Sequence, residues 1–169
     1  SAEREQRGTE VCITLKEDAK EFLDASRLRQ VVKRHSDFVQ YPIYIGDSQE
    51  PANRQTALWR GNPRELEAEA YHEFYKQLTL DFNDPLAYEH MTVDAPAQMY
   101  ALLFLPESPQ NLVFSPRKEP GLKLYARKVL IQEFCTDLLP QYLPFIDGVV
   151  DSEDLPLNAA EELQLADDL

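Results

Sequence analysis

The side chains that could do nucleophilic or metal chemistry are spread along the chain and share no motif. The histidines, His35, His72 and His90, lie far apart in sequence, and we interpret them as surface or half-buried helix residues in preference to metal ligands. Cys12 and Cys135 show no metal-ligand spacing and no CxxC motif, so we expect two reduced, buried thiols in preference to a disulfide. These residues predict no metal site.

The carboxylates have a spacing that favours a solvated surface over acid–base catalysis. Glu65, Glu67, Glu69 and Glu73 lie along one region that we expect to be helical. The sequence contains no phosphate-binding GxxxxGK(S/T), no dinucleotide-binding GxGxxG, no HExxH zinc motif and no GxSxG nucleophile motif. Taken alone, the residues therefore predict a soluble α/β domain without a self-contained active site.

The charge of the chain is distributed unevenly. The 169 residues have a formal net charge of −13, which argues against a nucleic-acid partner because phosphate binding needs clustered Lys and Arg. All 17 Lys and Arg residues lie at or before Lys128, so residues 129–169, which hold ten Asp or Glu, are poorly suited to stabilise ATP phosphates. The longest apolar runs are of strand length, and none reaches the roughly 20 residues that would span a membrane.

Local patterns predict the elements that would hold these side chains. Alternating apolar residues predict strands at 11–15, 41–45, 86–93, 98–105 and 148–150, and one long strand over 122–132. Helical segments are expected from Asp18 with a capping box, from about Ser26, from Asn62-Pro63, and over 136–139. Helices before and between the strands of a mixed sheet suggest an α/β (α+β) fold, a three-layer α-β-α sandwich.

Several motifs resemble the middle domain of the heat-shock protein 90 chaperones, in the order and spacing of that family. Residues 148–158, GVVDSEDLPLN, resemble the start of its catalytic loop. The others include Ala57-Leu58-Trp59-Arg60 with Asn62-Pro63, Glu73-Phe74-Tyr75-Lys76, Asp81-Phe82-Asn83-Asp84-Pro85-Leu86 and Leu122-Lys123-Leu124-Tyr125. The short loop at 46–53 looks like the bacterial or organellar members.

The resemblance implies a domain organisation and a function. Residues 7–158 would form the large subdomain of the middle domain, residues 1–6 an N-terminal tail or cloning remnant, and residues 159–169 an acidic C-terminal helix or tail. In the family, ATP with Mg²⁺ is bound by a separate N-terminal nucleotide-binding domain, which we expect to lie outside this fragment. We therefore expect no cofactor in this fragment and no ATPase activity from it alone, although full-length members are ATPases.

The leading hypothesis is a fragment of a stress-response chaperone that binds and remodels client proteins and couples to ATP hydrolysis in the neighbouring domain. The implied partners are clients and that N-terminal domain, in a full-length homodimer of the bacterial cytoplasm or an organellar matrix. An alternative is a stand-alone client- or partner-binding module without ATPase coupling. An unrelated enzyme on a similar fold is the least favoured, because no catalytic constellation is visible.

Three site residues follow from the resemblance. Trp59 matches a Trp that contacts clients, and a core Trp is the alternative. Leu130 matches an apolar position that packs against the nucleotide-binding domain, with a strand core residue as the alternative. Asn158 matches the catalytic-loop Asn, although it would also suit a helix N-cap.

The resemblance stops after Asn158. The family continues with a small residue, Ser and then Arg-Glu, and the Arg reaches the γ-phosphate of ATP. Glu161 stands at that Arg position here, which reverses the charge that phosphoryl transfer needs. Either residues 159–169 are foreign sequence, which we favour, or the chain is a divergent homologue without the Arg.

Overall fold

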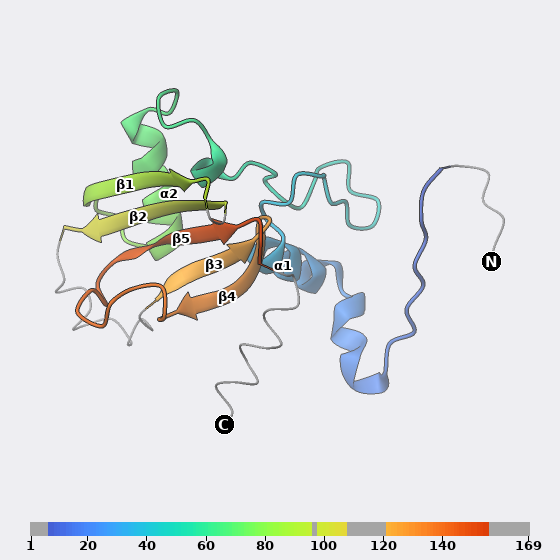
Figure 1. Cartoon of the computed structure of the whole chain (residues 1–169). Coiled ribbons are helices and arrows are strands. Elements are labelled where there is room, and N and C mark those ends of the chain that lie inside the picture. Colours follow the sequence, from blue (N-terminus) through green and yellow to red (C-terminus); the bar gives the residue numbers. More distant parts are fainter. Residues whose placement is uncertain (1–6, 96–97, 108–120, 156–169) are drawn as a thin grey trace.

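The computed structural model describes residues 7–95, 98–107 and 121–155 (Figure 1). Its helical elements are the 3-10 helix η1 (Glu17–Leu23), α1 (Ala25–His35), the 3-10 helix η2 (Leu58–Arg60) and α2 (Ala68–Thr79). Its strands are β1 (Pro85–Val93), β2 (Met99–Pro106), β3 (Leu122–Ala126), β4 (Val129–Cys135) and β5 (Asp147–Ser152). Within these ranges, no helix combines the length and apolar character that a membrane crossing requires.

The five strands form one mixed sheet in the order β1-β2-β5-β3-β4 (Figure 1). β5 pairs antiparallel with β2 and parallel with β3, so the last of the described strands lies at the centre of the sheet. Gly148 allows this close pairing. It has a φ of +157°, and a Cβ there would lie 3.0 Å from Leu103 Cα and would overlap the carbonyl oxygen of Leu102.

Both α-helices lie on one face of the sheet (Figure 1), and α2 supplies buried side chains to the aromatic core on that face. Trp59 is fully buried at its centre, with ring centroids 4.6 Å from Phe38, 4.9 Å from Tyr125 and 5.7 Å from Phe74. Edge-to-face and tilted ring pairs of this kind add to the stabilisation from apolar burial. The core therefore joins η2, α2 and β3 around a single indole.

The opposite face of the sheet has a smaller aliphatic core. Leu124, Cys135 and Val150 pack there against Leu139 and Ile146, which belong to the segment that joins β4 to β5. The predicted α+β class with a mixed sheet is confirmed. Of the expected three layers, the described part of the chain supplies the sheet and the helical layer on one face, and on the other face it places the 136–146 segment.

Two predicted strands are wrong. Residues 11–15 are not a strand, and Val11 is 76% exposed, because no neighbouring strand among the described residues pairs with this segment. Residues 41–45 are irregular because a side chain satisfies their backbone. Asn53 Oδ1 accepts from the Ile43 N–H at 2.8 Å, in place of a strand partner.

The helix starts also differ from the prediction. No side chain caps η1, so the capping box expected at Asp18 does not form, and Asp24 instead caps α1 by accepting from the N–H groups of Ser26 and Arg27. α2 begins at Ala68, later than expected, because Asn62 forms a turn in which its carbonyl accepts from the Glu65 N–H at 3.0 Å.

The long strand predicted over 122–132 is a hairpin of β3 and β4. Its two-residue turn is Arg127-Lys128, whose φ angles of 50° and 69° are those of a type I′ turn, although neither residue is a usual turn former. The helix predicted over 136–139 is a turn in the structure. The expectation of two buried thiols holds for Cys135 and is wrong for Cys12, which is exposed.

Candidate functional site

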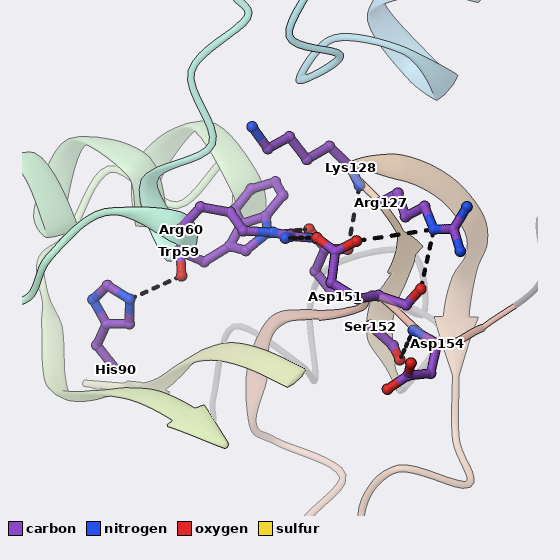
Figure 2. Close-up of polar contacts among 9 residues, drawn as sticks. Trp59, Arg60, His90, Arg127, Lys128, Asp151, Ser152 and Asp154 are labelled. Carbon is purple, nitrogen blue, oxygen red and sulfur yellow. Dashed lines mark hydrogen bonds and ion pairs between the residues drawn. The ribbon is translucent and has the colours of Figure 1, made fainter. Parts of the chain in front are cut away.

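A buried carboxylate, Asp151, lies near the end of β5. It has no exposed surface, and its Oδ2 accepts from Trp59 Nε1 at 2.8 Å and from Arg60 Nε at 2.7 Å (Figure 2). Its Oδ1 accepts from the Lys128 N–H at 3.2 Å. A buried charge is tolerated only when it is paired and hydrogen-bonded, and both conditions hold here. We call Trp59, Arg60, Lys128, Asp151 and Glu153 the Asp151 network.

Arg60 is the cation of the Asp151 network. Its side chain is 13% exposed, it pairs with both Asp151 and Glu153, and its guanidinium lies 4.2 Å above the Tyr100 ring. Burial lowers its pKa, but hydrogen bonds and attraction from the two carboxylates outweigh burial and raise the pKa above its usual value. Its Nη2 is buried and has no hydrogen-bond partner among the described residues.

Neighbouring elements fix η2, which carries Trp59 and Arg60. The carbonyl of Trp59 lies 3.0 Å from His90 Nε2, and the Tyr71 hydroxyl lies 2.9 Å from His90 Nδ1 (Figure 2 shows the first contact). Because a carbonyl can only accept, His90 donates its Nε2–H to Trp59, and in the neutral ring Nδ1 then accepts from the Tyr71 hydroxyl. Burial raises the pKa of Tyr71, which keeps this donor protonated. β1 and α2 thus hold η2 against the end of β5.

The backbone that leaves β5 is held from two sides. On one side, Arg127 donates its N–H to the Ser152 carbonyl at 3.1 Å and its Nε to the Glu153 carbonyl at 3.0 Å. On the other side, the Glu153 N–H donates to the Gln98 carbonyl at 3.1 Å, and the Gln98 N–H donates to Asp154 Oδ2 at 2.9 Å. The β3–β4 turn and the start of β2 therefore set the direction in which the chain continues.

This arrangement is suited to positioning and not to acid–base or nucleophilic chemistry. Asp151 and Glu153 are paired with Arg60, and across the described ranges no group of three or more His, Cys, Asp or Glu residues could hold a metal ion. The Asp151 network and Arg127 also do not fit nucleotide phosphates, because the Nε atoms of Arg60 and Arg127 are directed at a carboxylate and a carbonyl.

The structure places two of the predicted site residues in one core. Trp59 has no exposed surface, which is the core alternative left open by the sequence, and direct contact with a client is incompatible with this burial. Leu130 is 7% exposed and belongs to the same cluster, so in this structure it serves as a strand core residue. Asn158 and Glu161 lie outside the described residues.

Sequence reasoning assigned no role to Arg60, Arg127 or Asp151. A signal was present for Asp151, because it follows Gly148 and two valines in a strand that reads as buried on both faces, where a carboxylate requires a cationic partner. No comparable signal marks Arg127. Its role depends on the turn between β3 and β4, which contains no Gly or Asn by which it could be predicted.

The chain was compared with known proteins. The family model described as "Hsp90 protein" matches residues 46–167, which includes most of the segment 159–169 whose origin the sequence left open. "Chaperone protein HtpG" of Chlorobaculum tepidum is 49% identical over 164 residues, which cover 95% of this chain and 26% of that protein. The proteins of the same name from Desulfitobacterium hafniense and Myxococcus xanthus are 44% and 41% identical, cover 92% and 96% of this chain, and are themselves covered over 25% and 27%.

The α+β fold, the loop motif at 148–158 and these matches define one class, the Hsp90-type proteins. This chain belongs to the Hsp90 family, and its relatives identify the bacterial type. It spans about a quarter of the length of these relatives, 26% for the Chlorobaculum tepidum protein.

Proposed function

We propose that residues 7–158 are the large middle subdomain of a chaperone that binds and remodels client proteins and, in a longer protein, couples to ATP hydrolysis by an N-terminal domain. The observation that carries this proposal is the Asp151 network, which fixes the base of the segment resembling the family's catalytic loop. The homodimer and the place in the bacterial cytoplasm or an organellar matrix stay expectations from the resemblance.

A fixed base matters because a loop can act on a neighbouring domain only if its own position is defined. Ser152 is 4% exposed and Asp151 fully buried, so the last two residues of β5 move with the sheet. Arg127 and Gln98 then hold the backbone of Glu153, and the Gln98 N–H also holds the Asp154 carboxylate. Side chains placed on rigid elements with supporting hydrogen bonds keep a productive geometry better than side chains on unsupported loops.

Client binding is proposed for the longer protein and is not assigned to Trp59. The indole is enclosed by Phe38, Phe74 and Tyr125, and exposing it would break the aromatic core. Packing of Leu130 against the nucleotide-binding domain is likewise a proposal. The Leu130 side chain is buried in this structure. Interdomain contact through Leu130 would require the core to open.

The second candidate is a client- or partner-binding module without ATPase coupling. One observation favours it: Glu161 stands at the family's Arg position, and no Lys or Arg follows Lys128. A carboxylate beside the γ-phosphate would oppose the charge that develops during phosphoryl transfer.

A chimera separates the two candidates. The matching quarter of the Chlorobaculum tepidum protein is replaced by this chain, and ATP turnover and suppression of aggregation of a heat-unfolded client are measured. The coupled function predicts both activities, and the module predicts suppression without ATP turnover. Glu161→Arg in the chimera is the matched variant, and we expect it to raise turnover by about tenfold or more, as cations at transferred phosphates do.

The 169-residue chain by itself is the control. We expect no nucleotide-dependent turnover from it, because its described residues hold no metal-binding group and both carboxylates at the end of β5 are paired with Arg60. Measurable ATP hydrolysis by the purified chain would contradict both candidates. A chimera with neither activity would also contradict both, because both predict suppression of aggregation.

A further inference from the structure

A cleft lies on the helical face of the sheet, between α1, the C-terminal half of α2, and the strands β3 and β4. Its volume is about 450 Å³. Three aromatic side chains line it, Phe38, Phe74 and Tyr125, and each is less than a tenth exposed. The cleft is therefore a preformed hollow with an apolar floor, distinct from the Asp151 network.

The rim of this cleft is cationic, although the whole chain carries a net charge of −13. Five Lys or Arg side chains line it, against two carboxylates, Asp37 and Glu133. The cations are Arg29, Lys33, Arg34, Arg54 and Lys123. Such a concentration of one sign in a cleft raises the local concentration of ligands of the opposite sign.

Both carboxylates of the cleft are already neutralised. Asp37 is 4% exposed and lies 2.8 Å from Arg54 Nε. Glu133 accepts from Arg34 Nη2 at 2.6 Å and lies 3.6 Å from Lys123 Nζ. These ion pairs neutralise both carboxylates inside the cleft. The outer edge of the cleft is left with an excess of positive charge.

Arg29 and Lys33 supply that excess. They are exposed, one turn apart on α1, and neither forms an ion pair with any residue in the described ranges. Side chains four residues apart on a helix have Cβ atoms about 6 Å apart. Alternate residues of an extended peptide are separated by about 7 Å, so two carboxylates of one such peptide match the pair.

We propose that this cleft binds an extended acidic segment of a partner protein, with carboxylates on Arg29 and Lys33 and an apolar side chain on the aromatic floor. A nucleic acid is disfavoured by the charge of the chain as a whole, because its phosphates would meet an acidic surface outside the cleft. Among the described residues, none after Glu133 lines the cleft, so the described start of the loop that follows β5 takes no part in this binding.

Binding of a short fluorescein-labelled peptide, rich in Glu with one central Phe, to the 169-residue chain tests this inference by fluorescence anisotropy. We expect saturable binding at low salt that weakens as salt is added. The double variant Arg29→Ala/Lys33→Ala should bind about fivefold more weakly, the expected loss for two exposed charge pairs. A peptide with Gln in place of Glu should not bind.

The matched control is Lys16→Ala/Arg64→Ala, which removes the same charge from exposed positions outside the cleft. We expect it to bind like the parent chain, with circular dichroism showing both double variants folded. Amide shifts in an NMR titration should cluster at Arg29–Arg34, Arg54 and Lys123.

Three results would overturn the proposal. The first is the absence of saturable binding at low salt, and the second is an equal loss in both double variants, which would indicate attraction to charge in general. The third is full displacement of the peptide by inorganic phosphate with shifts at the same amides, which would assign the cleft to a small anion.

Discussion

Asp151 is a buried carboxylate whose ionised form is stabilised by three hydrogen-bond donors from two different elements. Trp59 and Arg60 approach it from η2, and the Lys128 N–H approaches it from the β3–β4 turn. Removing one partner of a buried ion pair costs more than the pair itself contributes, because the other charge is left without compensation. The two acidic residues of the Asp151 network should therefore differ sharply when they are neutralised.

Asp151→Asn should destabilise the fold by about 3 kcal/mol or more, since it leaves the buried Arg60 guanidinium with a neutral partner in place of Asp151. Glu153→Gln is the control, because Glu153 is 35% exposed and its pair is partly screened by water, so a loss of about 1 kcal/mol or less is expected. Urea unfolding followed by circular dichroism measures both. Equal midpoints for the two variants would show that Asp151 is not the anchor of the network.

Trp59 is the single Trp of the chain, so its fluorescence reports on one site. Because the indole has no exposed surface, we expect acrylamide to quench it weakly in the native chain and strongly in urea. Addition of an unfolded client should leave the quenching unchanged. A change in either direction on client addition would instead show that the client alters the surroundings of the indole, as the direct contact implied by the resemblance requires.

Residue types alone could not decide the position of Trp59. A Trp is equally suited to an aromatic core and to an exposed contact surface, and the preceding Ala57-Leu58 are compatible with both. The decision comes from Phe38 and Tyr125, which are distant in sequence and reach the indole only after the sheet has formed.

Among the elements, the centre of the sheet is the most sensitive to substitution. Gly148 lies where β5 approaches β2, and any Cβ there would overlap the β2 backbone, which must move for the chain to fold. The adjacent strands β2 and β3 cannot move away from Gly148 without losing their hydrogen bonds to β5. A single added methyl group should therefore disturb the whole sheet.

Gly148→Ala should lower the unfolding free energy by about 3 kcal/mol or more, as overpacking and backbone strain combine. Gly46→Ala is the matched control, because Gly46 also has positive φ, at +61°, but no atom lies within 4 Å of its Cβ position. Strain alone should cost it about 1 kcal/mol. Thermal unfolding compares the two, and similar losses would show that the contact with β2 is unimportant.

The elements that the sequence could predict are those with strong local patterns. The two strands at 86–93 and 98–105 agree with β1 and β2, and the helix expected near Ser26 agrees with α1. The hairpin of β3 and β4 was missed because Arg127 and Lys128 adopt positive φ with neither Gly nor Asn in the turn. Asp151 of β5 and Glu153 just after it hold this turn, and no local pattern reports contacts over more than 20 residues of sequence.

For the whole molecule, the pH dependence of stability follows from carboxylates whose ionised form is stabilised in the fold. Hydrogen bonds and ion pairs stabilise these carboxylates in the folded chain and are lost on unfolding. Hydrogen bonds from Ser26 and Arg27 hold the pKa of Asp24 below its usual value, and a hydrogen bond from Lys76 does the same for Asp84. Burial raises the pKa of Glu133, but Arg34 and Lys123 outweigh burial and lower it. All three therefore favour the folded state when ionised.

Stability should be constant from neutral pH down to about pH 5 and should fall below that as these carboxylates are protonated. The sign follows because a pKa lowered by folding contributes stability above the unfolded value and loses it as the pH drops through the folded value. Asp24→Asn keeps a helix-capping side chain but removes the titration, so its urea midpoint should fall less steeply between neutral and acid pH. Parallel curves for the variant and the parent would exclude Asp24 as a contributor.

At alkaline pH the sign reverses. Burial raises the pKa of Tyr75 to about 12, so its neutral form favours the fold fully below the unfolded value of about 10. That contribution should disappear as the pH rises through about 12, and Tyr75→Phe should show a smaller alkaline loss of stability in the same urea titration.

The central place of β5 sets an order in which the chain can be completed during synthesis. The ribosome releases β1 and β2 first and β3 and β4 next, and each of these pairs can close by itself as a hairpin. The sheet stays divided until β5 emerges and inserts between them, pairing with β2 on one side and β3 on the other. A nascent chain stalled before Asp147 would therefore present two separate hairpins with unpaired edges, and the final residues of the fold, not the first, would determine when it becomes resistant to proteases.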